Sequence, residues 1–428
     1  MKKLDLLTLG DELLLGLRAN AHLDYLGGEF ARHGLPLRRN LVVRDELSEI
    51  ERAFRDCWES ADVVVTTGGL GPTSDDNTRE AVARVLGLPL EFDPAAEAAI
   101  VERFARVGRV IRDDDRKQCY RPRGAELLRN RLGTAPGIYL EHAGKILVML
   151  PGPTNELRPM FESEVVPRLQ EAGVLQSCEA YLQLRTASVP ELQVARRIQP
   201  VVDKYPGLGL AYCAHQGMVD VRIAAGARDF GPEELKAIGQ ELRLVLGEDF
   251  VCFGRATLAQ VVLDELRVRE ATLAVAESCT GGLLASALTD VPGASQVFLG
   301  GVVSYTDDAK VQLLDVPETI LEQHGPFSAE TALAMATGVA EKFGADYALS
   351  VTGLAGPTGG TTQLPVGTVF LAYSSPNGAW SRQMLYTGDR LTVKARAAQG
   401  ALDWMRRKLL KYKVEDLLAA SASASAGG

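Results

Sequence analysis

Residues 271–276 form an apolar run that leads directly into the motif E-S-C-T-G-G at 277–282, and a second apolar segment with helical spacing follows at 283–288. This order predicts a strand, a tight turn and a helix, and therefore a parallel α/β sheet with its chemistry at one edge. The turn carries a hydroxyl, Ser278, and the unbonded N–H groups at the helix start could receive a developing oxyanion. A glycine-rich turn that only packs is the alternative for this motif taken alone.

Serine is a weak nucleophile at neutral pH and needs a base nearby. No histidine lies close in the sequence, but Tyr305 and Lys310 follow the next apolar segment, 298–303. Ser278, Tyr305 and Lys310 together suggest an amide hydrolase of the Ser–Lys type. A solvated surface amine is the alternative for Lys310.

Three neighbouring residues complicate this interpretation. Asp307 and Asp308 lie beside Lys310, and carboxylates favour a charged ammonium, so we expect them to face solvent or to orient a cationic Lys310. Cys279 is a rival nucleophile, because a helix N-terminus lowers the pKa of a thiol. Neighbouring side chains at such a turn diverge, so only Ser278 or Cys279 can face a substrate.

Length, composition, net charge and cysteine content limit the classes of protein to which this chain can belong. At 428 residues, with 46% hydrophobic and 24% charged residues, the chain should form two or three globular domains. The formal net charge of -9 argues against nucleic-acid binding, and no apolar run approaches the ~20 residues that a membrane span needs. Six scattered cysteines without a C-x-x-C pair predict reduced thiols in a cytoplasmic protein and no structural zinc site.

The fold class predicted is α/β, with two α/β domains of parallel-rich sheets joined by a small α+β domain. The expected domains are residues 1–172, 173–253 and 254–415. Their clearest strands are expected at 3–9, 37–43, 62–67, 145–150, 179–186 and 218–224. The clearest helices are expected at 20–33, 47–60, 190–202, 232–246 and, as an apolar stripe, 398–412. The tail 416–428 ends in a Ser/Ala/Gly-rich stretch and is expected to be disordered.

The strand at 62–67 leads into a second glycine-rich motif, T-G-G-L-G-P-T-S-D-D at residues 67–76. Glycines let the backbone approach a phosphate, and hydroxyls donate to it. The candidate phosphate contacts are Gly68, Gly69, Gly71 and Thr73. Asp75 and Asp76 could hold a hard divalent cation that stabilises charge in pyrophosphate cleavage. An Asp that only caps the helix beginning near Thr78 is the alternative.

Four motifs in this order resemble the CinA family: G-D-E-L-L-L-G at 10–16, the glycine turn at 67–76, G-T-A-P-G at 133–137 and L-P-G-P at 150–153. In that family the N-terminal domain resembles molybdopterin-binding enzymes. The resemblance implies a metal-dependent ADP-ribose pyrophosphatase, with Asn20 among the substrate contacts.

The chain departs from the family just after Asn20, where Ala21 and His22 replace a Thr-Asn pair. One hydroxyl and one amide are therefore missing, which would weaken or alter the pyrophosphatase where those groups touch substrate or metal. His22 could substitute as a ligand, although a lone surface histidine is the more common outcome.

The C-terminal part resembles nicotinamide-nucleotide amidases of the PncC type. The resemblance rests on A-E-S-C-T-G-G at 276–282, G-G-V-V-S-Y at 300–305, A-K at 309–310, H-G at 324–325, V-T-G-L-A-G-P at 351–357, P-V-G at 365–367 and G-D-R at 388–390. It implies hydrolysis of nicotinamide mononucleotide to nicotinate mononucleotide and ammonia, without a cofactor.

The roles that the resemblance implies follow the chemistry of amide hydrolysis. Ser278 attacks the amide carbon, Lys310 accepts its proton, and Tyr305 orients or relays that proton. The remaining substrate contacts are expected from Thr280, Gly281 and Gly282 at the oxyanion, from Arg390 at the phosphate, and from Thr352 and Gly353.

The middle segment occupies the position of a small KH-like domain in CinA proteins. It has no G-x-x-G clamp and few aromatic residues, so we expect a spacer or dimerisation element, in a homodimer that binds neither nucleic acid nor membrane. The leading hypothesis is a bifunctional enzyme of pyridine-nucleotide salvage. The alternatives are an amidase with a decayed N-terminal site, and a binding protein linked to competence or DNA repair.

Overall fold

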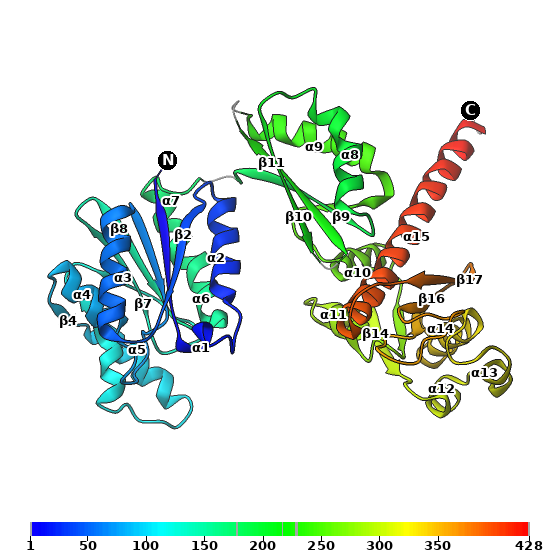
Figure 1. Cartoon of the computed structure of the whole chain (residues 1–428), viewed down its shortest axis with the longest axis horizontal. Coiled ribbons are helices and arrows are strands. Elements are labelled where there is room, and N and C mark those ends of the chain that lie inside the picture. Colours follow the sequence, from blue (N-terminus) through cyan, green and yellow to red (C-terminus); the bar gives the residue numbers. More distant parts are fainter. Residues whose placement is uncertain (1, 177–178, 216, 227–229, 427–428) are drawn as a thin grey trace. The chain divides into compact units, whose positions relative to one another are not determined.

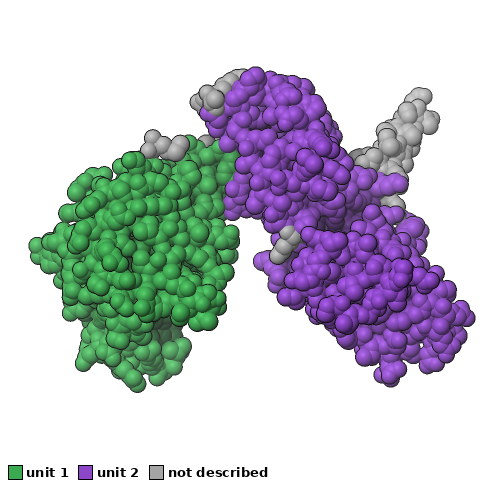
Figure 2. Space-filling view, viewed as in Figure 1, with its two compact units in different colours: residues 1–181 green, residues 182–428 purple. Residues whose placement is uncertain are grey.

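The protein is described from a computed structural model, which covers residues 2–176, 179–215, 217–226 and 230–426, with side chains up to residue 411. Contacts divide the chain into two compact units, Met1–Tyr181 and Leu182–Gly428, coloured separately in Figure 2. The first boundary lies close to the predicted one. Each unit is described by itself.

Unit 1 is built around a six-stranded sheet in the order β2-β1-β3-β8-β7-β6. The strands from β2 to β8 run parallel, and β7 and β6 are antiparallel additions. The central strand β3 is Val-Val-Val-Thr-Thr and buried throughout, as suits a strand covered on both faces. The strand bounds are β1 Leu4–Leu9, β2 Leu37–Val43, β3 Val63–Thr67, β6 Glu126–Leu128, β7 Gly137–His142 and β8 Lys145–Leu150.

Helices cover both faces of this sheet (Figure 1). The cluster on one face contains residues of α2 and α6, and the cluster on the other contains residues of α3 and α4. A two-stranded antiparallel sheet, β4 Leu90–Phe92 with β5 Tyr120–Pro122, lies outside the main sheet. The helices are α1 Asp11–Leu14, α2 Ala21–Arg32, α3 Leu47–Ser60, α4 Thr78–Leu86, α5 Pro94–Ala105, η1 Asp114–Cys119, α6 Thr154–Met160, η2 Phe161–Val165 and α7 Val166–Glu171.

Unit 2 begins with a four-stranded sheet in the order β10-β11-β9-β12. Two of its strands were not predicted: β10 is an edge strand with no fully buried side chain, and β12 has only four residues. Neither carries a run of buried β-branched residues that sequence patterns detect. The bounds are β9 Tyr181–Ala187, α8 Glu191–Val202, β10 Leu208–His215, β11 Met218–Ala225, α9 Pro232–Leu246, η3 Gly247–Asp249 and β12 Phe250–Phe253.

The larger sheet of unit 2 has the order β14-β13-β15-β16-β17, with the first three strands parallel and the last two antiparallel. Helices α10, α11 and α15 contribute to the cluster on one face, and α12 and α14 to the cluster on the other. The bounds are α10 Leu258–Val268, β13 Leu273–Glu277, α11 Leu283–Thr289, η4 Ala294–Gln296, β14 Phe298–Val303, α12 Asp307–Leu314, α13 Glu318–His324, α14 Ala329–Phe343, β15 Tyr347–Gly353, β16 Thr368–Ser375, β17 Gly378–Leu385 and α15 Arg390–Ala426.

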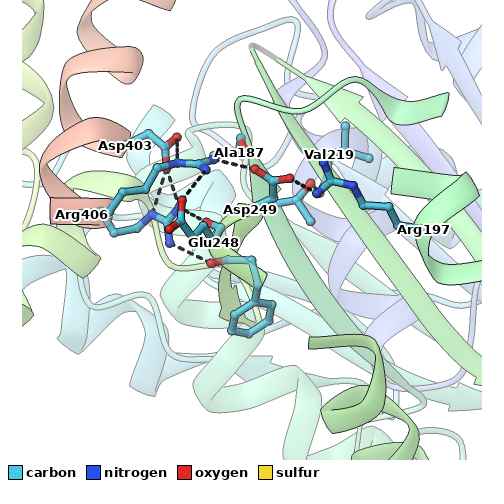
Figure 3. A network of polar contacts seen from close by, with 10 residues as sticks. Ala187, Arg197, Val219, Glu248, Asp249, Asp403 and Arg406 are labelled. Atoms are coloured by element: carbon cyan, nitrogen blue, oxygen red, sulfur yellow. Dashed lines mark hydrogen bonds and ion pairs between the residues drawn. The ribbon is translucent and has the colours of Figure 1, made fainter. Parts of the chain in front are cut away.

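The small sheet is joined to the larger one through a shared core and a buried charge network. Ala187, Met218 and Val251 of the small sheet belong to the same hydrophobic cluster as α10 and α15. In the network, shown in Figure 3, Arg406 of α15 donates to the carbonyls of Phe250 and Glu248. The domain predicted for residues 173–253 therefore packs as part of unit 2 from Leu182 onward.

Three predictions concern the ends and surface of the chain. Helix α15 extends to Ala426, but the side chains beyond residue 411 lie outside the described part, so the disordered tail stays a prediction. Five cysteines are unpaired, and Cys178 falls outside the described residues. In the part of the chain that the structure describes, no helix is long and apolar enough to cross a membrane.

Candidate functional site

Alternation of side chains along β13 sends Ser278 and Cys279 to opposite faces of the larger sheet. Ala274 and Ala276 pack in the cluster that includes α12 and α14, whereas Val275 and Cys279 pack in the cluster that includes α10, α11 and α15. Ser278 continues the even-numbered series, so its side chain belongs to the face of α12 and α14.

The peptide bond between Glu277 and Ser278 is held from both sides. The Ser278 N–H donates to the Val351 carbonyl at 2.9 Å, and the Glu277 carbonyl accepts from the Ser304 N–H at 2.8 Å. These bonds belong to the last register pairs of the parallel ladder, Glu277 with Val303 and Glu277 with Val351. Ser278 is therefore fixed at the carboxyl edge of the sheet, and it is 2% exposed.

The glycines after Ser278 bring the helix start back over Glu277. Gly281 and Gly282 have φ values of 61° and 96°, which other residues rarely adopt. The Glu277 carboxylate, 1% exposed, accepts from the N–H groups of Gly282 and Leu284 at 3.0 Å and of Ala285 at 2.8 Å. Glu277 thus caps α11 from the preceding strand, a role that the sequence analysis missed.

This cap changes the prediction for the oxyanion site. The Gly282 N–H is taken by Glu277, and the Gly281 N–H donates to the Ser278 carbonyl at 3.1 Å. Of the three predicted donors, Thr280 alone has an N–H without a partner among the described residues. Gly281 and Gly282 therefore shape the turn, and of the three only Thr280 remains a predicted oxyanion donor.

Lys310 lies on the same face of the sheet as Ser278. It is 1% exposed and stands one helical turn before Leu314, which packs in the cluster with Ala276. Its Nζ contacts the Thr306 carbonyl and Asp307 Oδ1, both at 3.4 Å. Lys310 is therefore no surface amine, and Asp307, which was expected to face solvent or orient the lysine, touches it while half exposed.

Cys279 is buried in the opposite cluster, at 6% exposure. Burial raises the pKa of its thiol to about 12, because the charged thiolate is poorly solvated there. The expectation that the helix N-terminus lowers this pKa is wrong, since burial outweighs it. The structure thus favours Ser278 over Cys279 as the nucleophile.

Tyr305 has a different partner from the one predicted. It is 58% exposed, and its hydroxyl accepts from Arg390 Nη2 at 2.8 Å; no bond joins it to Lys310 among the described residues. Arg390 also donates to the Gly356 carbonyl at 2.7 Å. Lys394, one turn further along α15, and Arg390 both lower the pKa of the Cys279 thiol against the effect of burial, so both cations flank the turn.

Thr352 and Gly353 serve the packing of the sheet edge. The Thr352 hydroxyl is buried and donates to the Pro326 carbonyl at 2.7 Å. A Cβ on Gly353 would lie 2.4 Å from the Thr368 carbonyl oxygen, so only glycine lets β16 approach. Their predicted contact with substrate stays a prediction.

The glycine turn after β3 closes on the start of α4. Gly69 has φ +65°, and a Cβ there would lie 2.1 Å from Thr78 Oγ1, whose hydroxyl donates to the Gly68 carbonyl at 2.9 Å. Asp76 Oδ2 accepts from the Thr73 N–H at 2.9 Å and from its hydroxyl at 2.6 Å. Thr73 and Asp76 therefore close the turn, and Asp75 remains exposed.

His22 is part of this site and not a lone surface histidine. Its Nε2 lies 2.6 Å from the Gly152 carbonyl and its Nδ1 3.0 Å from Thr67 Oγ1. Burial lowers the pKa of the imidazole, so the neutral ring donates through Nε2 and accepts at Nδ1. Both nitrogens are committed, so His22 is not free to bind a metal. The neighbouring Asn20 caps α2 through Oδ1, while its Nδ2 is buried without a partner in the described residues.

Asp75 and Asp76 are the predicted ligands of a divalent cation. No three His, Cys, Asp or Glu side chains in the described residues are arranged to hold a metal by themselves. Mg²⁺ is often bound by one or two carboxylates together with substrate phosphates. Asp75 is exposed, so its carboxylate is charged at neutral pH and suits a cation that arrives with a diphosphate.

A cavity of about 980 Å³ adjoins the glycine turn. Thr73, Ser74 and Lys117 line it, and Tyr120 and Leu90 supply apolar surface. Its rim also carries Arg109, Arg112 and Arg116 among four acidic side chains, Glu80, Asp113, Asp114 and Asp115. Arg109 and Arg116 pair with acidic neighbours, and the Arg112 guanidinium has no partner in the described part of the chain.

Sequence comparison decides the family. Residues 255–409 match the model described as CinA C-terminal domain, and residues 5–171 match the one described as probable molybdopterin binding domain. A CinA-like protein of Kosmotoga olearia is 39% identical over 411 residues, which cover 95% of this chain and 99% of that protein. The chain belongs to the CinA family.

A second CinA-like protein, from Desulfovibrio desulfuricans, is 40% identical over 418 residues, covering 96% of this chain and 97% of that one. Among solved structures, the competence/damage inducible protein CihA from Agrobacterium tumefaciens is 39% identical over 35% of this chain and 91% of its own, with a TM-score of 0.34. Both sites of this CinA protein lie inside the matched regions, and the small sheet lies between them.

Proposed function

We propose that the C-terminal site hydrolyses the carboxamide of nicotinamide mononucleotide to give nicotinate mononucleotide and ammonia. The observation that carries this proposal is the shared face of Ser278 and Lys310 at the sheet edge, with Cys279 turned into the opposite core. A hydroxyl nucleophile and a buried amine are the parts of a serine amidase. CinA membership supports the proposal without naming the substrate.

In this mechanism Ser278 Oγ attacks the amide carbon while its proton passes towards Lys310 Nζ. The Thr280 N–H stabilises the oxyanion of the tetrahedral intermediate. The protonated lysine then supplies a proton to the leaving nitrogen, which departs as ammonia. Water attacks the resulting ester, and Ser278 regains its proton as the carboxylate product forms.

Arg390 and Lys394 are the proposed phosphate contacts. They stand one turn apart at the start of α15 and flank the turn that carries Ser278. Guanidinium and ammonium groups form strong charge-assisted hydrogen bonds with phosphate oxygens. The exposed Tyr305, held by Arg390, supplies a ring surface beside them. This arrangement favours a phosphorylated substrate over the free riboside.

The test is ammonia release from nicotinamide mononucleotide by the full-length protein, with nicotinate mononucleotide quantified as the second product. Lys310→Met and Lys310→Arg should both abolish turnover, because guanidinium cannot act as a base. Lys394→Ala should raise KM about tenfold with little change in kcat. Equal hydrolysis of nicotinamide riboside would contradict the phosphate contacts.

A metal-dependent ADP-ribose pyrophosphatase is the second candidate function, in unit 1. The favouring observation is the cavity beside Thr73 and Ser74, which has cationic side chains on its rim and Tyr120 in its wall. A diphosphate would lie against the glycine turn, within reach of Arg112, and Asn20 Nδ2 offers a buried donor. A divalent cation held by Asp75 would supply positive charge to the bridging oxygens.

This second function is tested with ADP-ribose in the presence of Mg²⁺ or Mn²⁺, by measuring AMP and ribose 5-phosphate. Asp75→Asn should abolish cleavage, and Arg112→Ala should raise KM about tenfold. A protein that releases ammonia normally but leaves ADP-ribose intact would support the alternative of a decayed N-terminal site.

A further inference from the structure

Ser304 is a second hydroxyl at the edge that carries Ser278. It is 0% exposed, and its Oγ has no hydrogen-bond partner among the described residues. Buried hydroxyls almost always have partners, because an unpaired one costs about 1–3 kcal/mol. An unpaired hydroxyl of this kind is therefore expected to serve a bound molecule or a reacting group.

Strand register places Ser304 next to Ser278. Glu277 and Val303 are the last pair of the parallel ladder, and the Ser304 N–H donates to the Glu277 carbonyl at 2.8 Å as part of that pair. Ser304 and Ser278 are thus the next pair in register, and register partners in a parallel sheet project to the same face.

The residues that precede Ser304 in β14 show which face of the larger sheet its side chain lies on. A Cβ on Gly300 would lie 2.6 Å from Phe343 of α14, and Val302 packs against the cluster of α12 and α14. Ser304 follows this even-numbered series towards the edge. Lys310 is the fourth residue of α12 and is buried one turn before Leu314, which packs in the same cluster, so Ser278, Ser304 and Lys310 share this face.

We propose that Ser304 is a further catalytic residue, whose hydroxyl carries the proton between Ser278 and Lys310; this rests on the proposed amidase. As Ser278 Oγ bonds to the carbonyl carbon, its proton moves to Ser304 Oγ while the proton of Ser304 moves to Lys310 Nζ. The reverse transfer delivers a proton to the leaving nitrogen as the C–N bond breaks. Water completes the cycle by cleaving the ester. Tyr305, whose hydroxyl accepts from Arg390, then takes no part in the proton transfer.

The experiment measures two rates in the full-length protein: covalent labelling of Ser278 by a fluorophosphonate, followed by intact mass, and turnover of nicotinamide mononucleotide. Ser304→Ala is compared with Ser350→Ala. Ser350 lies on the same face, and its buried hydroxyl donates to the Ala332 carbonyl of α14 at 2.6 Å. Thermal unfolding of each variant is recorded alongside.

The relay predicts that Ser304→Ala slows labelling and lowers kcat by about 100-fold or more, with KM changed less than about threefold. Ser350→Ala should keep both rates within about threefold of the wild type. Ser304→Thr, which keeps a hydroxyl, should recover part of the labelling rate.

Wild-type labelling in Ser304→Ala would overturn the relay, as would equal losses in Ser304→Ala and Ser350→Ala. A wild-type protein in which the reagent fails to label Ser278 would overturn it too. Labelling that depends on Ser304 without hydrolysis of nicotinamide mononucleotide would support the relay and contradict only the proposed substrate.

Discussion

At the scale of single residues, side-chain direction decides which group can react. Ser278 and Cys279 are neighbours in sequence, yet one faces α12 and α14 while the other lies in the core beneath α15. Both were candidates in the sequence, and the resemblance to the amidases assigned the attack to Ser278. Counting the alternation from Ala274 and Ala276 would have settled it.

Cys279 should be inert to thiol reagents in the folded protein. With a pKa of about 12, only about one thiol in ten thousand is ionised at pH 8, and only the thiolate reacts. Alkylation with iodoacetamide at pH 8, followed by peptide mass spectrometry, should modify the exposed Cys213 and spare Cys279. Equal modification of both would show that Cys279 is accessible.

His22 should make the stability of unit 1 depend on pH. Burial lowers the pKa of the folded imidazole below its ordinary value of 6.5, so the unfolded chain binds the extra proton first. Stability contributed by neutral His22 is complete above pH 6.5 and is lost as the pH falls towards the folded pKa. Hydrogen exchange of unit 1 between pH 7.5 and 5.5 measures this loss.

The matched variants for that measurement are His22→Gln and His324→Gln. The first should flatten the pH dependence of unit 1, and the second, a half-exposed histidine of unit 2, should leave it unchanged. If the stability of unit 1 depends on pH in the same way in His22→Gln as in the wild type, other titratable groups cause that dependence.

At the scale of helices and strands, the bounds of several segments were predicted well. The strands at 37–43 and 145–150 and the helix at 47–60 have the predicted bounds. Edge strand β10 and short β12 were missed because their side chains are not regularly buried. The cap from Glu277 was missed because it depends on the path of the chain through Gly281 and Gly282.

Glu277→Gln should weaken both α11 and the active site. A glutamine amide group would face N–H donors that the carboxylate now accepts from, so we expect a loss of about 2 kcal/mol in unfolding free energy. The turn that holds Ser278 and the Thr280 N–H would shift, and kcat should fall more than tenfold.

Urea unfolding and steady-state kinetics measure these two effects, with Glu270→Gln, an exposed site before β13, as the control. A Glu277→Gln protein with wild-type kcat would show that the cap does not position the nucleophile.

At the scale of the whole molecule, the chain has one packing boundary where the sequence suggested two. The boundary near residue 172 was predicted because the alternation of strand-like and helix-like segments in the sequence changes there. The division near residue 253 is weaker, because the small sheet has a core of its own around Leu184, Val221 and Leu242 while Ala187, Met218 and Val251 join the core of the larger sheet. Buried contacts between segments far apart in sequence leave no local signal.

Arg406→Met should destabilise all of unit 2. The guanidinium is fully buried, donates to Asp403, and holds the Phe250 and Glu248 carbonyls of the small sheet (Figure 3). Removing one partner of such a buried pair costs about 3–5 kcal/mol. Urea unfolding, followed by fluorescence of Trp380 and Trp404, should shift to lower denaturant in this variant.

The exposed Arg382→Met is the control and should keep the wild-type midpoint. If the larger sheet of unit 2 unfolds at the wild-type midpoint in Arg406→Met, the small sheet contributes nothing to its stability.

The most direct test of the account compares ammonia release from nicotinamide mononucleotide by the wild type, Ser278→Ala and Cys279→Ala. The geometry predicts that Ser278→Ala loses activity by about 1,000-fold or more, whereas Cys279→Ala, a change in the opposite core, keeps at least about a third of it. Activity that survives in Ser278→Ala and disappears in Cys279→Ala would contradict the assignment of the nucleophile and the two-faced arrangement on which it rests.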